Sequence, residues 1–201
     1  MASDCVHIID DDEAIRDSLS FLLESAGFET RTYDSAERFL ESAAGLSGGC
    51  IVSDVRMPGL NGLEMTRQLK AMQVNLPIVM ITGHGDVPLA VEAMKAGVTD
   101  FLEKPFNDEA LLNAIKVALS ETATGGGGVL TEPFRELLAQ LSPRETEVLR
   151  GVVEGKANKI IAFELGISPR TVEVYRANVM TKTGAASLSE LIRMALLAGF
   201  A

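Results

Sequence analysis

Side chains suited to metal and phosphoryl chemistry closely follow four short apolar runs in this sequence. They are Asp10, Asp11 and Asp12 after residues 6–9, Asp54 after residues 50–53, Thr82 after residues 76–81, and Lys104 after residues 100–102. Carboxylates and water are the ligands that a hard Mg²⁺ ion prefers. Such an ion would bring a carboxylate and a transferring phosphoryl group together, while Lys104 and Thr82 hold the remaining phosphoryl oxygens. A single acidic residue after a strand is usually a solvated loop residue, so the recurrence after four runs is what favours a site.

The apolar runs alternate with helical patterns over the first half of the chain. A weaker alternating stretch at 28–33 is typical of an outer strand, and Ile15, Leu19 and Leu22 mark one face of the first helix, closed by Gly27. Five strands alternating with five helices predict an α/β domain with a five-stranded parallel sheet covered on both faces. Ligands of such sheets lie outside the carboxyl ends of the strands, so the polar residues above should converge on one crevice.

A glycine-rich segment, TATGGGGVLTEP at 122–133, separates the two halves of the chain. Glycine loses the most backbone freedom on ordering, so this composition favours a flexible linker. A glycine turn within one domain is the alternative. We therefore predict a first domain at 1–121, a linker at 122–133 and an all-α second domain at 134–201 with four short helices.

Capping residues divide the second half into helices. Ser142 with Glu145, and Ser187 with Glu190, have the spacing of capping boxes, while the helix at 157–165 should stop at Gly166. A new helix should begin at Pro169, which predicts a helix-turn-helix. Polar residues on or near it that suit phosphate or base contacts are Lys156, Asn158, Lys159, Arg170, Thr171, Glu173, Arg176, Asn178 and Lys182. A solvated helix in a helical packing module is the alternative interpretation.

Charge and cysteine content limit the function classes. The net charge of −10 is uneven, with 20 acidic and 9 basic residues at 1–121 but 8 acidic and 9 basic residues at 122–201. The acidic half is not expected to bind nucleic acid by general electrostatics. Cys5 and Cys50 lie in apolar contexts and are predicted to be structural thiols, since no disulfide or metal spacing joins them. With no apolar run of membrane length and no secretion signal, we expect a cytoplasmic protein without a membrane partner.

The first half resembles the receiver domains of bacterial two-component response regulators. The resemblance rests on IIDDDEAIR (8–16), IVSDVRMPGLNG (51–62), VMITGHGD (79–86) and DFLEKPF (100–106). It implies that Asp54 accepts a phosphoryl group from a sensor histidine kinase. The implied Mg²⁺ ligands are Asp10, Asp11, Asp54 and the main-chain carbonyl of Arg56. The implied phosphate-binding and switch residues are Thr82, Phe101, Lys104 and Pro105, with a cis Lys104–Pro105 bond.

The second half resembles the LuxR/NarL-type output domains through LSPRETEVL, GKANKIIAFELGIS and RTVEVY. Glu173 and Tyr175 stand where many members carry lysine and histidine, so a sequence preference does not transfer. The stretch PRTVEVYRANVM is similar to the FixJ-type regulators of nitrogen-fixation and microaerobic genes. That similarity implies a FixL-like oxygen-sensing kinase, promoter DNA and RNA polymerase as partners, and a homodimer when phosphorylated. In this class the last helix often forms a dimer contact, although its apolar residues could equally be core; they include Leu188, Leu191, Ile192 and Ala195.

Two enzyme classes fit the sequence less well. A phosphatase of the haloacid dehalogenase type expects an aspartate two residues after its nucleophile, but Val55 and Arg56 follow Asp54. A dinucleotide-binding enzyme needs a G-x-G-x-x-G loop, and DDDEAIR occupies that position. We therefore expect no enzyme activity beyond the chain's own aspartyl phosphorylation and dephosphorylation. A module whose helical half binds a protein is a further alternative.

Overall fold

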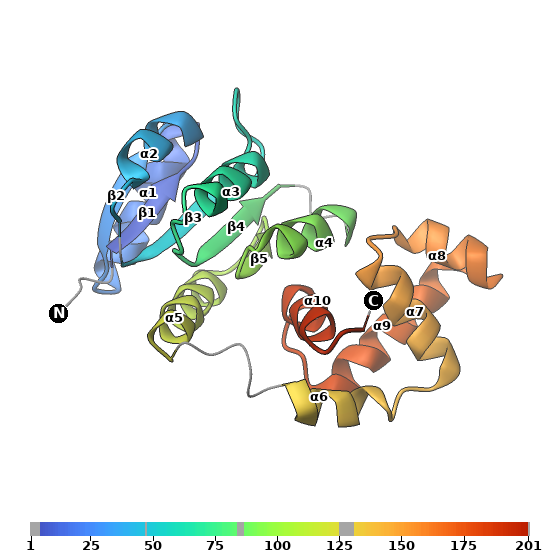
Figure 1. The fold of residues 1–201 in the computed structure, drawn as a ribbon. Helices are drawn as coiled ribbons and strands as arrows, with labels where there is room; N and C mark the ends of the chain where they lie inside the picture. Colours follow the sequence, from blue (N-terminus) through green and yellow to red (C-terminus); the bar gives the residue numbers. More distant parts are fainter. Residues whose placement is uncertain (1–4, 47, 84–86, 125–130, 201) are drawn as a thin grey trace. The chain divides into compact units, whose positions relative to one another are not determined.

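The computed structural model describes residues 5–46, 48–83, 87–124 and 131–200 (Figure 1). The chain divides into two compact units, residues 1–85 with 96–125 and residues 86–95 with 126–201. The domain boundary predicted at residue 121 stays a prediction. Within the described ranges, no helix combines the length and the apolar character needed to cross a membrane.

A five-stranded parallel sheet organises the first part of the chain, as predicted. Its strand order is β2 (Glu29–Tyr33), β1 (Cys5–Ile9), β3 (Cys50–Asp54), β4 (Ile78–Thr82) and β5 (Asp100–Glu103). The helices that alternate with the strands are α1 (Glu13–Ser25), α2 (Ala36–Ala43), α3 (Gly62–Ala71), α4 (Val87–Ala96) and α5 (Asp108–Thr124). The weak stretch at 28–33 forms the edge strand β2, as expected for its alternating pattern.

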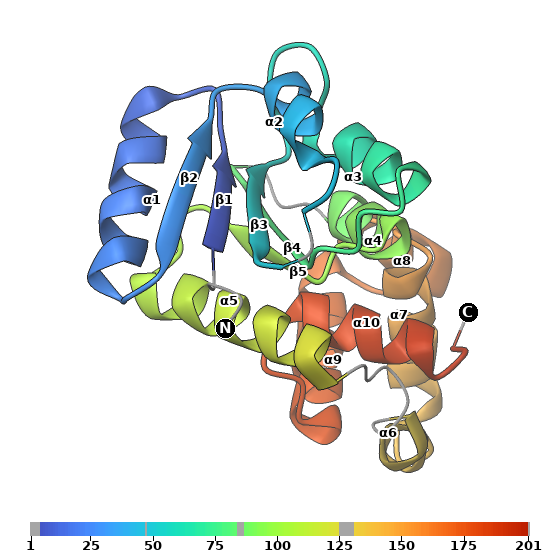
Figure 2. The same ribbon diagram turned by 60° about the vertical axis from the view of Figure 1, so that its left-hand side comes forward.

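Alternation along β1 separates two apolar layers. Val6 and Ile8 pack with Leu23 of α1 and Leu111 of α5 on one face of the sheet. His7 points to the other face, where its ring lies 5.4 Å from that of Phe39 on α2. The helices on the two sides of the sheet are visible in Figure 2.

Both cysteines are buried and free, which confirms the structural-thiol prediction. Cys50 packs in the same apolar cluster as Val6. Cys5 is next to Val6 on β1, so its side chain points to the opposite face of the sheet. Burial raises the pKa of the Cys50 thiol to about 12, which makes it a poor nucleophile.

Five helices form the second part of the described chain. They are α6 (Thr131–Leu138), α7 (Pro143–Val153), α8 (Asn158–Leu165), α9 (Pro169–Thr183) and α10 (Leu188–Leu197). Phe134, Leu149, Val179 and Leu191 lie at their shared core. The capping box of Ser142 and Glu145 forms as predicted.

Three sequence-based expectations need correction. The predicted linker at 122–133 is helical at both ends, because α5 continues to Thr124 and α6 begins at Thr131; residues 125–130 lie outside the described part. The additional helix α6 brings Phe134 into the core, so the helical part has one helix more than predicted. At α10, Ser187 accepts from the Glu190 amide as expected, but the Glu190 carboxylate accepts from the amide of Ala186 rather than that of Ser187.

Candidate functional site

The loop after β1 holds Asp10 in a fixed position. Asp10 is only 4% exposed, and its Oδ1 accepts a 2.9 Å hydrogen bond from the Asp12 amide. The main-chain carbonyl of Asp10 accepts from the Arg16 guanidinium on α1 at 2.8 Å. Asp12 caps α1 by accepting from the Ala14 amide, while Asp11 is exposed. The loop therefore buries the Asp10 carboxylate and leaves Asp11 exposed to solvent.

Asp54 ends β3 and is held by the loop that follows it. Its Oδ1 accepts a 2.8 Å hydrogen bond from the Arg56 amide. Gly62 begins α3 directly against this turn, since a Cβ atom there would lie 2.5 Å from the Asp54 main-chain oxygen. The close packing of glycine against β3 fixes the path of the loop, and Oδ2 of Asp54 remains available to a partner.

Lys104 joins the two carboxylates. Its Nζ lies 2.9 Å from Oδ2 of Asp54 and 3.5 Å from Oδ2 of Asp10. The main-chain amide of Lys104 donates to the carbonyl of Thr82 at 2.7 Å, which ties the end of β5 to the end of β4. Side chains that follow three different strands therefore meet at the carboxyl edge of the sheet, where the sequence predicted a crevice.

The charges of the crevice shift the pKa values of its members. Burial raises the pKa of Asp10 above its ordinary value, although the hydrogen bond from Asp12 and the charge of Lys104 oppose this rise. Burial alone would lower the pKa of Lys104, but the hydrogen bond and charge of Asp54 outweigh it and raise that pKa. Lys104 is therefore a firmly protonated cation at neutral pH, as a phosphate-binding lysine must be.

The remaining predicted switch residues lie at the end of β4, on β5 and directly after Lys104. Thr82 is fully buried at the end of β4, and Phe101 is half-buried on β5. The Lys104–Pro105 peptide bond is cis, as the family resemblance implied. The structure thus locates these residues, while their switch roles stay predictions.

The local charge suits Mg²⁺, although the structure defines no complete ligand set. Among the residues that it describes, no three histidine, cysteine, aspartate or glutamate side chains form a metal-binding group. Asp10 and Asp54 nevertheless share the single Lys104 ammonium, and the neighbouring Asp11 adds further negative charge. Mg²⁺ is commonly held by one or two carboxylates with oxygen ligands from water. The residues therefore fit this ion, and the ligand set that includes the Arg56 carbonyl stays a prediction.

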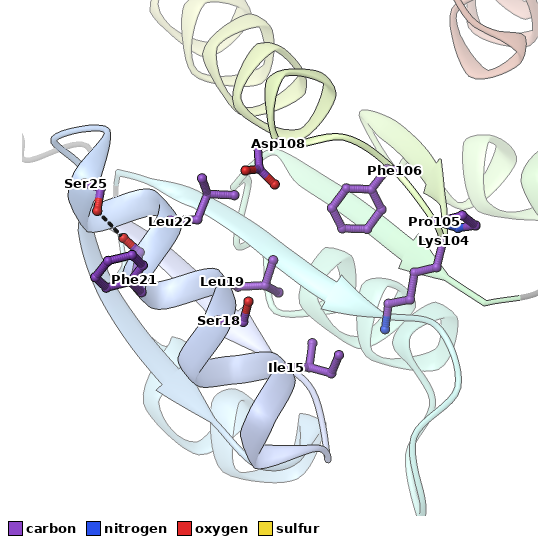
Figure 3. A pocket seen from close by; sticks show the side chains of 10 residues that line it. All are labelled: Ile15, Ser18, Leu19, Phe21, Leu22, Ser25, Lys104, Pro105, Phe106 and Asp108. Atoms are coloured by element: carbon purple, nitrogen blue, oxygen red, sulfur yellow. Dashed lines mark hydrogen bonds between the residues drawn. The ribbon is translucent and has the colours of Figure 1, made fainter.

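A pocket of about 410 Å³ opens beside Lys104. Residues of α1 form one wall, and the segment from Lys104 to Asp108 forms the other (Figure 3). Phe21, on the α1 wall, is 75% exposed. The crevice that contains Asp54 and Lys104 is thus bordered by a pocket with a large exposed aromatic side chain.

The predicted helix-turn-helix is present as α8 and α9. Gly166 ends α8 in a left-handed conformation with φ 66°, and Ser168 caps α9 by accepting from the Thr171 amide. Five of the predicted DNA-contacting residues are exposed: Lys159, Arg170, Glu173, Asn178 and Lys182. Thr171 is partly buried, and its hydroxyl lies 2.8 Å from that of Ser168.

Several of the predicted DNA contacts are engaged within the helical unit. Lys182 on α9 binds the buried Glu145 at 2.7 Å, and this bond, followed by the Ser142 amide, lowers the pKa of Glu145. Lys156 pairs with Glu154 and Glu164 at 2.8 and 2.7 Å.

The Arg176 guanidinium donates to Oδ1 of Asn158 at 3.0 Å, which joins α9 to α8. Burial lowers the pKa of Arg176. Arg176 and Asn158 therefore join the two helices in addition to any role at DNA, as Lys182 joins α9 to α7.

Val174 is a candidate DNA contact that the sequence reasoning missed. It is 54% exposed on α9, midway between Arg170 and Asn178 at four-residue spacing. These three side chains therefore share one exposed face of the helix. An apolar side chain on such a face can contact a thymine methyl group. The four-residue spacing was the available signal, but only polar residues were considered.

The last helix contributes to the core of the helical unit. Leu191 and Ala195 belong to the apolar cluster around Phe134, Ile192 is buried and Leu188 is partly buried. The core interpretation of α10 is supported for these residues, and the dimer contact stays a prediction.

Comparisons with known proteins match both parts of the chain. Residues 6–116 match the response regulator receiver domain, and residues 139–195 match the bacterial regulatory proteins of the luxR family. The first match includes Asp10, Asp54 and Lys104, and the second includes α8 and α9.

Relatives match this chain over nearly its whole length. The transcriptional regulatory protein FixJ of Azorhizobium caulinodans is 56% identical over 197 residues, which cover 98% of this chain and 93% of that protein. The response regulator protein TodT of Pseudomonas putida is 42% identical, covering 94% and 84% respectively. The crystal structure of full-length FixJ from B. japonicum has a TM-score of 0.58 and 52% identity, covering 100% of both chains.

Proposed function

Because this chain belongs to the FixJ-like response regulators, with a receiver domain and a LuxR-type DNA-binding domain, we propose that it is a transcription regulator switched by phosphorylation of Asp54. The observation that carries this proposal is the 2.9 Å contact between Nζ of Lys104 and Oδ2 of Asp54. A carboxylate with one oxygen held by a main-chain amide and the other by a lysine is oriented for attack on phosphorus.

The proposed transfer is a displacement at phosphorus. An oxygen of Asp54 forms the new O–P bond as the bond from phosphorus to a nitrogen of the kinase histidine breaks. The residues that would hold Mg²⁺ are Asp10, Asp11, Asp54 and the main-chain carbonyl of Arg56. When bound, the ion supplies neutralisation of the charge that develops on the phosphoryl oxygens. Lys104 then contacts one of those oxygens instead of the free carboxylate.

The pocket bordered by Phe21 and Lys104 is the proposed approach for the kinase. It is continuous with Lys104, and it offers an exposed aromatic side chain to the domain that carries the phosphohistidine. Replacing Phe21 with Ala should slow transfer from a FixL-like kinase and leave labelling by acetyl phosphate unchanged. Equal slowing with both donors would remove this role.

We propose that the phosphoryl group changes the output through Thr82 and Phe101. The Thr82 hydroxyl can donate to a phosphoryl oxygen. If Thr82 shifts to make this hydrogen bond, Phe101 and the loop after β4 would change conformation with it. We propose that the unphosphorylated receiver restrains the DNA-binding domain, by docking or by blocking dimerisation. Phosphorylation then favours a homodimer, for which α10 is a candidate contact.

Promoter recognition is assigned to the exposed face of α9. Arg170 and Asn178 can bind phosphates or base edges, and Val174 between them can meet thymine methyl groups. The other proposed contacts are Lys156, Asn158, Lys159, Thr171, Glu173, Arg176 and Lys182. The similarity to FixJ, at 56% identity against 42% for TodT, favours control of nitrogen-fixation or microaerobic genes through a FixL-like kinase and RNA polymerase.

Acetyl phosphate labelling tests this function without knowledge of the kinase. We expect labelling of the full chain to require Mg²⁺, and the labelled protein to bind promoter DNA more tightly than the unlabelled protein. Added salt should weaken that binding steeply, because phosphate contacts release counterions. Labelling that leaves DNA affinity unchanged would refute the switch, and salt-independent binding to a protein partner would favour the interaction module.

A further inference from the structure

Glu37 of α2 reaches across to the loop that follows the phosphoacceptor strand. Its Oε1 accepts a 2.8 Å hydrogen bond from the main-chain amide of Leu60, which is 23 residues further along the chain. Gly59 has φ +76°, and a Cβ atom there would lie 2.6 Å from the same carboxylate oxygen. The turn at Gly59 and Leu60 is therefore packed directly around the Glu37 carboxylate.

The two ends of this loop are fixed by other contacts. At its start the Arg56 amide donates to Asp54, and the Gly62 amide donates to the carbonyl of Val55 at 3.0 Å. At its end Asn61 forms a capping box with Glu64. Glu37 thus holds the loop at Leu60, just before the N-cap of α3, from a helix that carries no residue of the crevice itself.

We propose that Glu37 is a positioning residue for the divalent cation, acting through the main-chain carbonyl of Arg56. This inference rests on the proposed function, in which that carbonyl is a Mg²⁺ ligand. The Arg56 carbonyl belongs to the loop that Glu37 holds, and a peptide carbonyl can be a reliable ligand only while its loop keeps one conformation. Residues that orient metal ligands from outside the ligand set commonly change metal affinity by about 10–100-fold.

The length and the charge of Glu37 can be tested separately. Glu37→Asp keeps the negative charge in the first turn of α2 but withdraws the oxygen from Leu60. Glu37→Gln keeps an acceptor oxygen at the same reach but removes the charge. Glu37→Ala removes both, and Glu41→Ala is the matched control on an exposed position of the same helix.

The experiment is a titration of each full-length, unphosphorylated protein with Mn²⁺, in which electron paramagnetic resonance measures the free ion. We expect Glu37→Ala and Glu37→Asp to weaken Mn²⁺ binding by about tenfold, whereas Glu37→Gln and Glu41→Ala stay within about twofold of the unsubstituted chain. Acetyl phosphate labelling should then need more Mg²⁺ in Glu37→Ala and Glu37→Asp, yet reach the same maximal rate. Thermal unfolding of each variant confirms that the fold is kept.

Three results would decide against the inference. Unchanged Mn²⁺ affinity in Glu37→Ala would overturn it, even if the melting temperature fell. Equal weakening in Glu37→Gln would also overturn it, because charge rather than the hydrogen bond to Leu60 would then be responsible. Mn²⁺ binding that is insensitive to Asp10→Asn would instead refute the proposed metal site, and with it the premise of the inference.

Discussion

The α/β unit and the helical unit use their charged side chains differently. At the carboxyl edge of the sheet, Lys104 contacts Asp54 and Asp10, so the residues predicted to act together lie together. In the helical unit, Lys182 instead binds the buried Glu145, and Arg176 binds Asn158. The predicted DNA contacts Lys156, Arg176 and Lys182 thus have partners in their own domain.

This difference follows from the geometry of the two folds. Parallel strands all end at the same edge, so the residue type after each strand predicts which side chains meet. A helix displays side chains all round, and its spacing says only which residues share a face. Whether a cation on that face points to solvent or to a buried carboxylate depends on a helix that is distant in the sequence.

The largest expected effect is at the single residue that accepts the phosphoryl group. Asp54→Asn should abolish acetyl phosphate labelling while leaving the fold intact, because an amide oxygen is a far weaker nucleophile than a carboxylate. Radiolabel or mass measurement of the intact protein gives the result. Asp34→Asn, at an exposed carboxylate paired with Arg38, is the control and should label normally.

In the helical unit, replacing Arg170 should weaken DNA binding, whereas replacing the control residue Arg144 should not. Arg170→Ala should weaken binding to a selected DNA duplex by about 1–3 kcal/mol if it reads a base, and should lower the salt slope by about one if it binds a phosphate. Arg144, paired with Glu147 on α7, should change neither when replaced by Ala. Equal loss of DNA affinity in both variants would mean that general charge, rather than the α9 face, controls binding.

The pair Lys182 and Lys159 tests directly which cations serve the fold. Lys182→Met leaves the buried Glu145 carboxylate without its cation, so we expect a loss of about 1–2 kcal/mol in unfolding free energy. Lys159→Met, at an exposed position on α8, should change stability by less than about 0.5 kcal/mol but weaken DNA binding. Thermal unfolding followed by circular dichroism measures the stability, and DNA titration measures the affinity. Unchanged stability of Lys182→Met would mean that Lys182 does not stabilise the fold more than Lys159 does.

The two units should also respond differently to acid. His7 is 1% exposed with an Nε2 atom that has no hydrogen-bond partner, and burial followed by the charge of Arg31 lowers its pKa below 6.5. Its neutral form is favoured by the fold, so its contribution to stability is complete above pH about 6.5 and falls as the pH drops toward the lowered pKa. The loss cannot exceed about 1.4 kcal/mol per pH unit.

Calorimetry between pH 7.5 and 5 should therefore show this loss for the α/β unit. The helical unit, which contains no histidine between residues 131 and 200, should lack it. His7→Leu should flatten the dependence. An unchanged slope in that variant would assign the acid sensitivity to other groups.

Much of the fold was accessible from the sequence, because apolar runs and capping residues mark its elements locally. The edge strand β2 and the turn at Gly166 are examples. Helix α6 was missed because Pro133 and the preceding glycines indicated a linker, although Phe134, Leu137 and Leu138 have helical spacing. Proline is tolerated in a first helical turn, so it did not exclude this helix.

The candidate sites also contain parts that could be predicted from the sequence and parts that could not. The crevice of Asp10, Asp54 and Lys104 was predictable from strand ends. The hydrogen bonds that Lys182 donates to Glu145 and that the Leu60 amide donates to Glu37 were not, since they join residues 37 and 23 positions apart through tertiary packing. Val174 has the spacing of a residue on the same face as Arg170 and Asn178, but an apolar residue on a helix is usually core, so its exposure could not be predicted from spacing.

Locating the phosphoryl group tests the central claim most directly. The protein labelled with acetyl phosphate and Mg²⁺ is reduced with borohydride, which converts an aspartyl phosphate to homoserine, and its peptides are sequenced by mass spectrometry. The account predicts homoserine at position 54 alone. Homoserine at Asp10, Asp11 or another carboxylate, with Asp54 unmodified, would contradict it.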